Sequence, residues 1–158
     1  MKTLTKDWLQ QRHACAESLI WVDSISPVSI TQSVKDLKST KPNWALWIAM
    51  REMSSTDCTQ LLKYMLDILK DVYDTPYPNS DCYSLTKEQL GNIMKGIRDS
   101  CDPLNIFVGM LVHYGFVKKS SDPTFIQNAT YEVAEYTLAK RPDLASSIVD
   151  YSTTLLEK

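Results

Sequence analysis

Residues 61–72 read LLKYMLDILKDV, and this stretch decides the fold class. Its apolar residues recur at steps of three and four, which places them on one face of an α-helix. On the other side, Lys63 and Asp67 are four residues apart and form a solvated face. Because residues 54–57 offer several N-cap side chains, we expect a helix from there to about Tyr73.

Similar helical patterns cover most of the remaining chain. Capping residues and prolines at first helical positions mark the starts of these segments. The further expected helices span residues 5–22, 29–37, 44–53, 84–97, 102–115, 122–138 and 142–156. The patterns predict an all-α fold, a single compact and bundle-like domain of about eight helices over residues 1–158. An irregular loop at 74–84 is expected between two helical halves.

Composition argues against several classes of protein. The hydrophobic fraction of 44% in 158 residues supports a buried core and argues against disorder. A net charge of -2 argues against both a general nucleic-acid binder and a strongly acidic DNA mimic. Residues 1–7 have no apolar run after the first lysine, so we expect no secretory signal, and no run of apolar residues is long enough to span a bilayer. We therefore expect a cytoplasmic protein with no membrane partner.

The cysteines and histidines offer little catalytic chemistry. Four cysteines without a Cys-x-x-Cys pair are expected to be small buried or half-buried hydrophobes. His13 and Cys15 are two residues apart, which would direct them to different sides of a helix. Because no catalytic, phosphate-binding or metal-binding motif is present, we predict no catalytic, cofactor or metal residues. The alternative is a small metal-dependent or thiol-using enzyme in which the fold gathers His13, Cys15, His113 and carboxylates.

Acidic and aromatic side chains in the middle of the chain are candidates for protein binding. Asp67, Asp71 and Asp74 fall on one helical face, where they could meet a basic partner, hold a cation or only solvate the helix. Tyr77 and Tyr83 lie in the expected loop. An interface that combines an aromatic anchor with a charged rim would use these five residues.

A smaller basic cluster favours a second alternative. Lys35, Lys38 and Lys41 recur at steps of three and precede Trp44. Lysines beside a tryptophan can contact single-stranded nucleic acid, which makes a nucleic-acid-binding accessory protein the second alternative. The near-neutral charge argues against this role.

All four tryptophans lie in the first third of the chain. We expect Trp8, Trp21, Trp44 and Trp47 to form an aromatic core between the first helices, with Trp21 and Trp47 more firmly inside it than Trp8. The other interpretation is that one of these rings is an exposed binding anchor.

Two segments within residues 8–53 carry a resemblance. Residues 14–22 read ACAESLIWV, and residues 43–48 read NWALWI. This resembles an Ala-Cys-x-x-x-Leu-x-Trp segment followed by a Trp-x-x-Trp segment in small helical proteins of bacteriophages and other mobile elements. Some phage proteins of this size inhibit host defence, for example as anti-CRISPR proteins that bind an effector complex.

These observations together predict a non-enzymatic protein-binding module. The resemblance implies a phage-encoded inhibitor of a host defence complex that acts by occluding a surface, with a host or phage protein complex as its partner. No cofactor is expected. The last helix could close the core or pair with a second copy, so a homodimer stays open.

Overall fold

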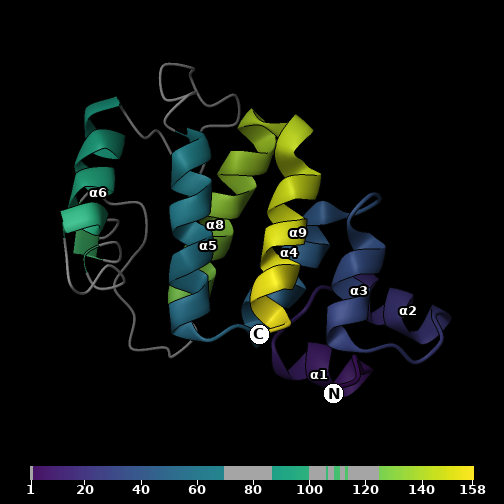
Figure 1. Ribbon diagram of the computed structural model, residues 1–158. Helices are drawn as coiled ribbons and strands as arrows, with labels where there is room; N and C mark the ends of the chain where they lie inside the picture. The colour runs from purple at the N-terminus through teal and green to yellow at the C-terminus, as the bar shows by residue number, and fades with distance from the viewer. Residues whose placement is uncertain (1, 70–86, 100–105, 107–108, 111–112, 114–124) are drawn as a thin grey trace.

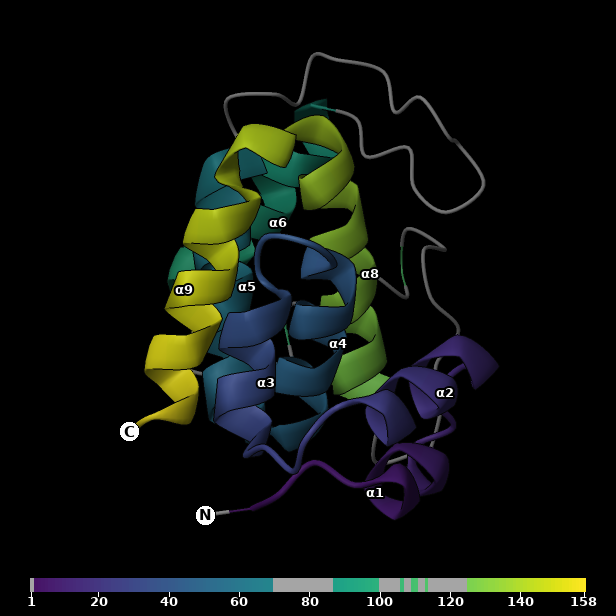
Figure 2. The same cartoon turned by 90° about the vertical axis from the view of Figure 1, so that its right-hand side faces the viewer.

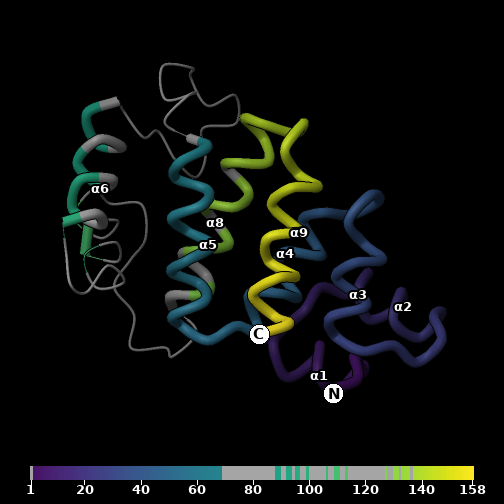
Figure 3. Tube along the Cα trace, viewed as in Figure 1, coloured from purple at the N-terminus to yellow at the C-terminus, as the bar shows by residue number. Residues whose placement is uncertain are grey.

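The structure is a computed structural model that describes residues 2–69, 87–99, 106, 109–110, 113 and 125–158 (Figure 1). Figure 3 shows the Cα trace in the same view. Within these ranges the ordered elements are helices, and the extended pairing is one isolated bridge between Thr3 and Ser29. The predicted all-α fold is confirmed. The elements are α1 (Lys6–Gln11), α2 (Ala16–Ser24), α3 (Ile30–Leu37), α4 (Pro42–Glu52), α5 (Ser55–Leu69), α6 (Lys87–Asp99), α8 (Phe125–Lys140), the 3-10 helix η1 (Pro142–Leu144) and α9 (Ala145–Leu156).

The helix α4 lies at the centre of the fold. It packs against α3, α8 and α9, and α5 packs against α8 and α9 (Figure 1). Because α4 is apolar around most of its circumference, it can be covered on several sides at once. The largest fully buried side chains are Leu9, Leu46, Met50, Leu61, Leu62, Met65, Leu66, Ile93 and Ile148.

Buried hydroxyl groups in the core are satisfied locally. Ser33, Thr137 and Ser152 are each almost fully buried. Their hydroxyls donate to the carbonyl oxygens of Ile30 at 2.6 Å, Val133 at 2.7 Å and Val149 at 2.7 Å. Since these acceptors lie one turn back in the same helix, the polar side chains enter the core without leaving an unpaired donor.

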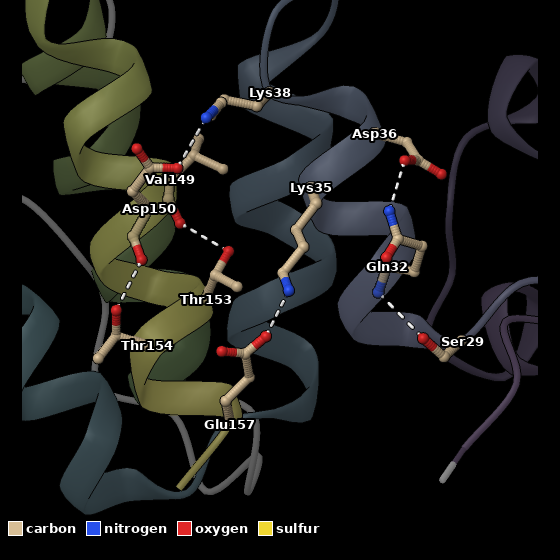
Figure 4. A network of polar contacts seen from close by, with 10 residues as sticks. All are labelled: Ser29, Gln32, Lys35, Asp36, Lys38, Val149, Asp150, Thr153, Thr154 and Glu157. Carbon is tan, nitrogen blue, oxygen red and sulfur yellow. Dashed lines mark hydrogen bonds and ion pairs between the residues drawn. The ribbon is translucent and has the colours of Figure 1, made fainter.

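The last helix is joined to α3 by two ion pairs on the surface. Lys35 pairs with Glu157, and Lys38 Nζ lies 2.9 Å from Asp150 Oδ1 (Figure 4). The helices themselves also pack against one another. Two of the three lysines in the expected basic cluster therefore have carboxylate partners within the fold.

The expected single helix over residues 5–22 is wrong, because the chain turns at residues 12–15. Thr5 caps α1 as predicted, its hydroxyl accepting from the Trp8 N–H at 3.0 Å. The helix ends in a Schellman motif, in which the Ala14 N–H donates to the Leu9 carbonyl and the His13 N–H to that of Gln10. His13 has a φ of 58°, the left-handed conformation that this motif requires. A new helix, α2, then begins after Cys15.

Candidate functional site

A cavity lies where the turn between α1 and α2 meets α4 and α8. The two short helices form a corner at one end of the molecule (Figures 1 and 2). The cavity has a volume of about 280 Å³, and we call it the aromatic pocket. Its lining consists of Leu9, His13, Ala14, Cys15, Ser18 and Trp21 from the corner, Trp44, Trp47 and Ile48 from α4, and Tyr131 from α8.

The four tryptophans form two edge-to-face pairs that join the corner to α4. The rings of Trp21 and Trp44 have centroids 5.9 Å apart, and those of Trp8 and Trp47 are 6.3 Å apart. This geometry is favourable for aromatic rings and adds to the free energy gained by burying them. The pairs join the corner to the central helix, and three of the four rings, Trp21, Trp44 and Trp47, line the pocket.

The expected aromatic cluster is confirmed, but the expected order of burial is wrong. Trp8 is buried, whereas Trp21, Trp44 and Trp47 are half-buried and line the pocket. Trp8 lies in α1, where Leu9 is also buried, and Leu4 is buried just before the helix begins. Its indole Nε1 is buried and has no hydrogen-bond partner within the described part of the chain.

Each of three tryptophan rings carries a cation on one face. Lys41 Nζ lies 3.7 Å from the centroid of the Trp44 ring, and Arg12 Cζ lies 4.0 Å from that of Trp8. Arg51 Cζ lies 5.1 Å from the Trp47 ring. These distances are within the range of cation–π attraction. Lys41, the third lysine of the expected basic cluster, thus lies on the ring of Trp44, the tryptophan predicted beside that cluster.

A thiol lies at the pocket on the N-terminal side of α2. Cys15 is exposed, so the expectation of burial is wrong for it, while Cys58 is buried as expected. Cys82 and Cys101 lie outside the described residues. Hydrogen bonds from the side chain and then the backbone of Ser18 lower the pKa of the Cys15 thiol. The Ser18 hydroxyl also donates to the Cys15 carbonyl oxygen at 2.7 Å, and with one proton it serves one acceptor at a time.

The opposite wall holds a phenol that stays protonated. Burial raises the pKa of Tyr131, and the charge of Glu135 and its hydrogen bond with the phenol raise it further. The hydroxyl therefore acts as a neutral hydrogen-bond donor to the carboxylate. This wall is polar at one point in a lining that is otherwise mainly aromatic and aliphatic.

His13 and Cys15 line the same pocket, which corrects the expectation that they point to different sides of a helix. The reason is that neither residue lies within a helix, since His13 is in the turn and Cys15 caps α2. His113 is exposed and is not part of this lining. Within the described residues, no group of three or more histidine, cysteine or acidic side chains could hold a metal ion.

The structure describes one of the five predicted protein-binding residues, and it does not line the pocket. Asp67 is exposed on α5. Asp71, Asp74, Tyr77 and Tyr83 lie outside the described residues.

A second cavity adjoins the first through a shared wall. It has a volume of about 340 Å³ and lies between the end of α2, the following turn and α3. Trp21 lines both cavities. Polar groups of Ser33, Asp36 and Thr40 contribute to the second one, together with the apolar Ile25 and Val28. The two cavities thus flank a single tryptophan on α2.

Comparison with known proteins leaves the site to be interpreted by its own chemistry. No family model matches the chain, and no curated protein or solved structure matches it. In the described part of the chain, every helix is too short or too polar to cross a membrane.

The sequence pointed to part of this site. The two segments that resemble phage proteins, 14–22 and 43–48, contribute Ala14, Cys15, Ser18, Trp21, Trp44, Trp47 and Ile48 to the lining. Reasoning from the sequence missed Tyr131, because nothing in its spacing relates it to residues more than eighty positions earlier. It also missed the cavity itself, which exists only because the chain turns at His13.

Proposed function

We propose that the protein is a non-enzymatic protein-binding module whose partner inserts an apolar side chain into the aromatic pocket. The observation that carries this proposal is the lining by three half-buried tryptophan rings, Trp21, Trp44 and Trp47. Tryptophan is enriched among the residues that dominate binding energy at protein interfaces. A cavity of about 280 Å³ lies just below the range for small-molecule sites, which suits a single side chain better than a cofactor.

The surroundings of the pocket favour an extended partner over a small molecule. Trp21 lines a second cavity as well, so a segment that passes over this residue can place one side chain in each. Ile20, the neighbour of Trp21 on α2, is 71% exposed. An exposed large apolar residue beside a hollow is typical of a surface that a partner covers.

The lining favours binding over nucleophilic catalysis. Among the described residues, the lining holds the Cys15 thiol and the His13 imidazole but no carboxylate. A cysteine nucleophile commonly needs a base that a third group orients. A thiol-using enzyme is therefore the weaker candidate.

The resemblance to phage helical proteins extends the proposal to a kind of partner. In this form of the proposal the partner is a host defence complex, and the protein inhibits it by occluding a surface. The residues of the resemblance are largely those that line the pocket, so the same surface would serve as the anchor.

The test fills the pocket with one larger side chain. Ala14 lines the pocket, whereas Ala16 is exposed at the start of α2 and does not line it. Wild-type protein is used to isolate a stoichiometric partner from bacterial lysate, and the affinities of Ala14→Leu and Ala16→Leu for it are then measured. We expect Ala14→Leu to weaken binding by about tenfold or more and Ala16→Leu to bind as wild type does. Equal binding by both variants, or no stoichiometric partner, would contradict the proposal.

Folding of the two variants is checked by circular dichroism and thermal unfolding. Ala14 occupies the position of the Schellman motif at which an apolar side chain contacts Leu9. Leucine keeps that apolar character, so we expect both variants to fold.

A further inference from the structure

We infer that the aromatic pocket selects an aromatic side chain from an acidic segment of a partner protein. The inference rests on the proposed function and names the chemistry of its partner. Two observations carry it together. Half-buried indole rings line the pocket, and cations lie on tryptophan rings in and beside it: Lys41 on Trp44, Arg51 on Trp47 and Arg12 on Trp8.

Two of the cations on the rings differ from nearby lysines in their ion pairing. Within the described part of the chain, neither Arg12 nor Lys41 forms an ion pair, although each lies on an indole ring. In contrast, four lysines of the same region have carboxylate partners, and these are Lys2 with Glu52, Lys6 with Asp23, Lys35 with Glu157 and Lys38 with Asp150. The charges of Arg12 and Lys41 are thus not neutralised by a carboxylate in the described part of the chain, and an acidic partner can pair with them.

Acidic groups near the aromatic pocket belong to α2 and α8, while Asp36 of α3 lines the second cavity and accepts a hydrogen bond from Gln32 at 2.8 Å. Glu135 is engaged with Tyr131 on α8, and Glu17 follows Cys15 on α2. Lys41 and Trp44 lie at the start of α4. Electrostatic complementarity therefore orients the partner, with its carboxylates toward the start of α4 and its aromatic ring in the hollow.

A cationic ligand is the competing occupant, because a cage of aromatic rings can bind a quaternary ammonium group. Here Lys41 already lies on Trp44, and Arg51 lies on Trp47. A further cation in the pocket would be repelled by Lys41 and Arg51, and these two side chains already cover part of the aromatic surface. The charges therefore favour an uncharged ring with acidic flanks.

The experiment compares capped pentapeptides with a central phenylalanine flanked by aspartate, serine or lysine, and a fourth with central trimethyllysine. Binding is followed by the intrinsic tryptophan fluorescence of the full chain, to which phenylalanine does not contribute. We expect the aspartate peptide to bind about tenfold tighter than the lysine peptide at low salt, and the difference to shrink as salt is added. Equal or tighter binding of the lysine or trimethyllysine peptide would overturn the inference.

A matched pair of variants assigns the effect to the pocket. Lys41→Met removes the charge on Trp44, and Lys63→Met makes the same change at an exposed position on α5. We expect Lys41→Met to weaken the aspartate peptide by about threefold and Lys63→Met to leave it unchanged. Equal effects of the two variants, or equal binding of the aspartate peptide to wild type and Ala14→Leu, would place the binding outside the pocket and overturn the inference.

The outcomes also separate this inference from the proposed function. If Ala14→Leu abolishes capture of a partner protein but none of the peptides binds, the module function stands and the acidic segment is rejected. If the aspartate peptide binds in the pocket but no partner protein is captured, the pocket takes this chemistry without serving the proposed function.

Discussion

Two cysteines in the described part of the chain lie in opposite environments. Cys15 is exposed beside the aromatic pocket, and hydrogen bonds from Ser18 lower its pKa. Burial raises the pKa of Cys58 to about 12, and the charge of Asp57 acts in the same direction. Because the thiolate is the reactive form, the two residues should differ in both rate of alkylation and its pH dependence.

We expect iodoacetamide to modify Cys15 in the folded protein and Cys58 only after unfolding. The alkylation rate of Cys15 should reach half of its maximum at a pH below the ordinary thiol pKa of 9.0. Replacing Ser18 by alanine removes one stabilising hydrogen bond from the thiolate, so the half-maximal pH should rise and the rate at neutral pH should fall. Site-resolved mass spectrometry over a pH series measures both effects.

The control for Ser18→Ala is Ser24→Ala in the same helix. Ser24 is exposed, and its hydroxyl donates to the Trp21 carbonyl oxygen at 2.6 Å. This variant should leave the pH profile of Cys15 unchanged. An unaltered profile in Ser18→Ala, or rapid labelling of Cys58 in the native state, would be inconsistent with the environments described.

At the scale of helices, Gly96 has side chains of other residues close to its Cα, whereas Gly109 has open space there. A Cβ on Gly96 in α6 would lie 2.8 Å from Ile106 Cγ2 and 3.1 Å from Met110 Sδ. A Cβ on Gly109 would meet nothing within 4 Å. Both residues are helical, so alanine would gain similar backbone stability at each and only the surroundings differ.

We therefore expect Gly96→Ala and Gly109→Ala to shift stability in opposite directions. Gly109→Ala should raise the free energy of unfolding by about 0.5–1 kcal/mol. Gly96→Ala should lower it by about 1 kcal/mol or more, since overpacking outweighs the gain in helix propensity. Urea denaturation of the two variants and wild type measures these changes.

A double variant identifies the contact that is responsible. Adding Ile106→Ala to Gly96→Ala removes the Cγ2 methyl group that would clash with the new Cβ at residue 96. The double variant should therefore be more stable than the sum of the single effects predicts. Simple additivity of the two substitutions would show that this contact does not limit the packing of α6.

The sequence predicted the starts of helices better than their ends. The caps at Thr5 and Ser29 are confirmed, because a hydroxyl that accepts from an N–H three residues later is a local interaction. The end of α1 could not be predicted in the same way, since His13 and not a glycine adopts the left-handed conformation there. We attribute that turn to packing with α4, where Trp8 and Trp21 each find a tryptophan partner.

The pocket shows the same limit at the scale of the whole molecule. The sequence predicts that tryptophans from the first helices cluster, because apolar rings in short helices have few other places to be buried. It does not predict which ring is covered and which lines a hollow. That depends on α8, which brings Tyr131 to the pocket, and thus on contacts between distant parts of the chain.

The last helix closes the molecule by two kinds of contact that should differ greatly in strength. Ile148 of α9 is fully buried, whereas Lys38 and Asp150 form an ion pair with side chains that are 34% and 61% exposed. Burial of an aliphatic side chain contributes several kilocalories per mole, and an exposed ion pair contributes little because water and salt screen it.

We expect Ile148→Ala to lower the free energy of unfolding by about 2–5 kcal/mol and Lys38→Met by less than about 1 kcal/mol. The loss in Lys38→Met should decrease further in 1 M salt, where the ~3 Å screening length weakens the pair even in wild type. The loss in Ile148→Ala should not decrease, since salt does not screen apolar burial. Urea denaturation at low and high salt measures both. A loss in Lys38→Met equal to that in Ile148→Ala would mean that the charged surface between α3 and α9, and not the core beneath it, holds the last helix in place.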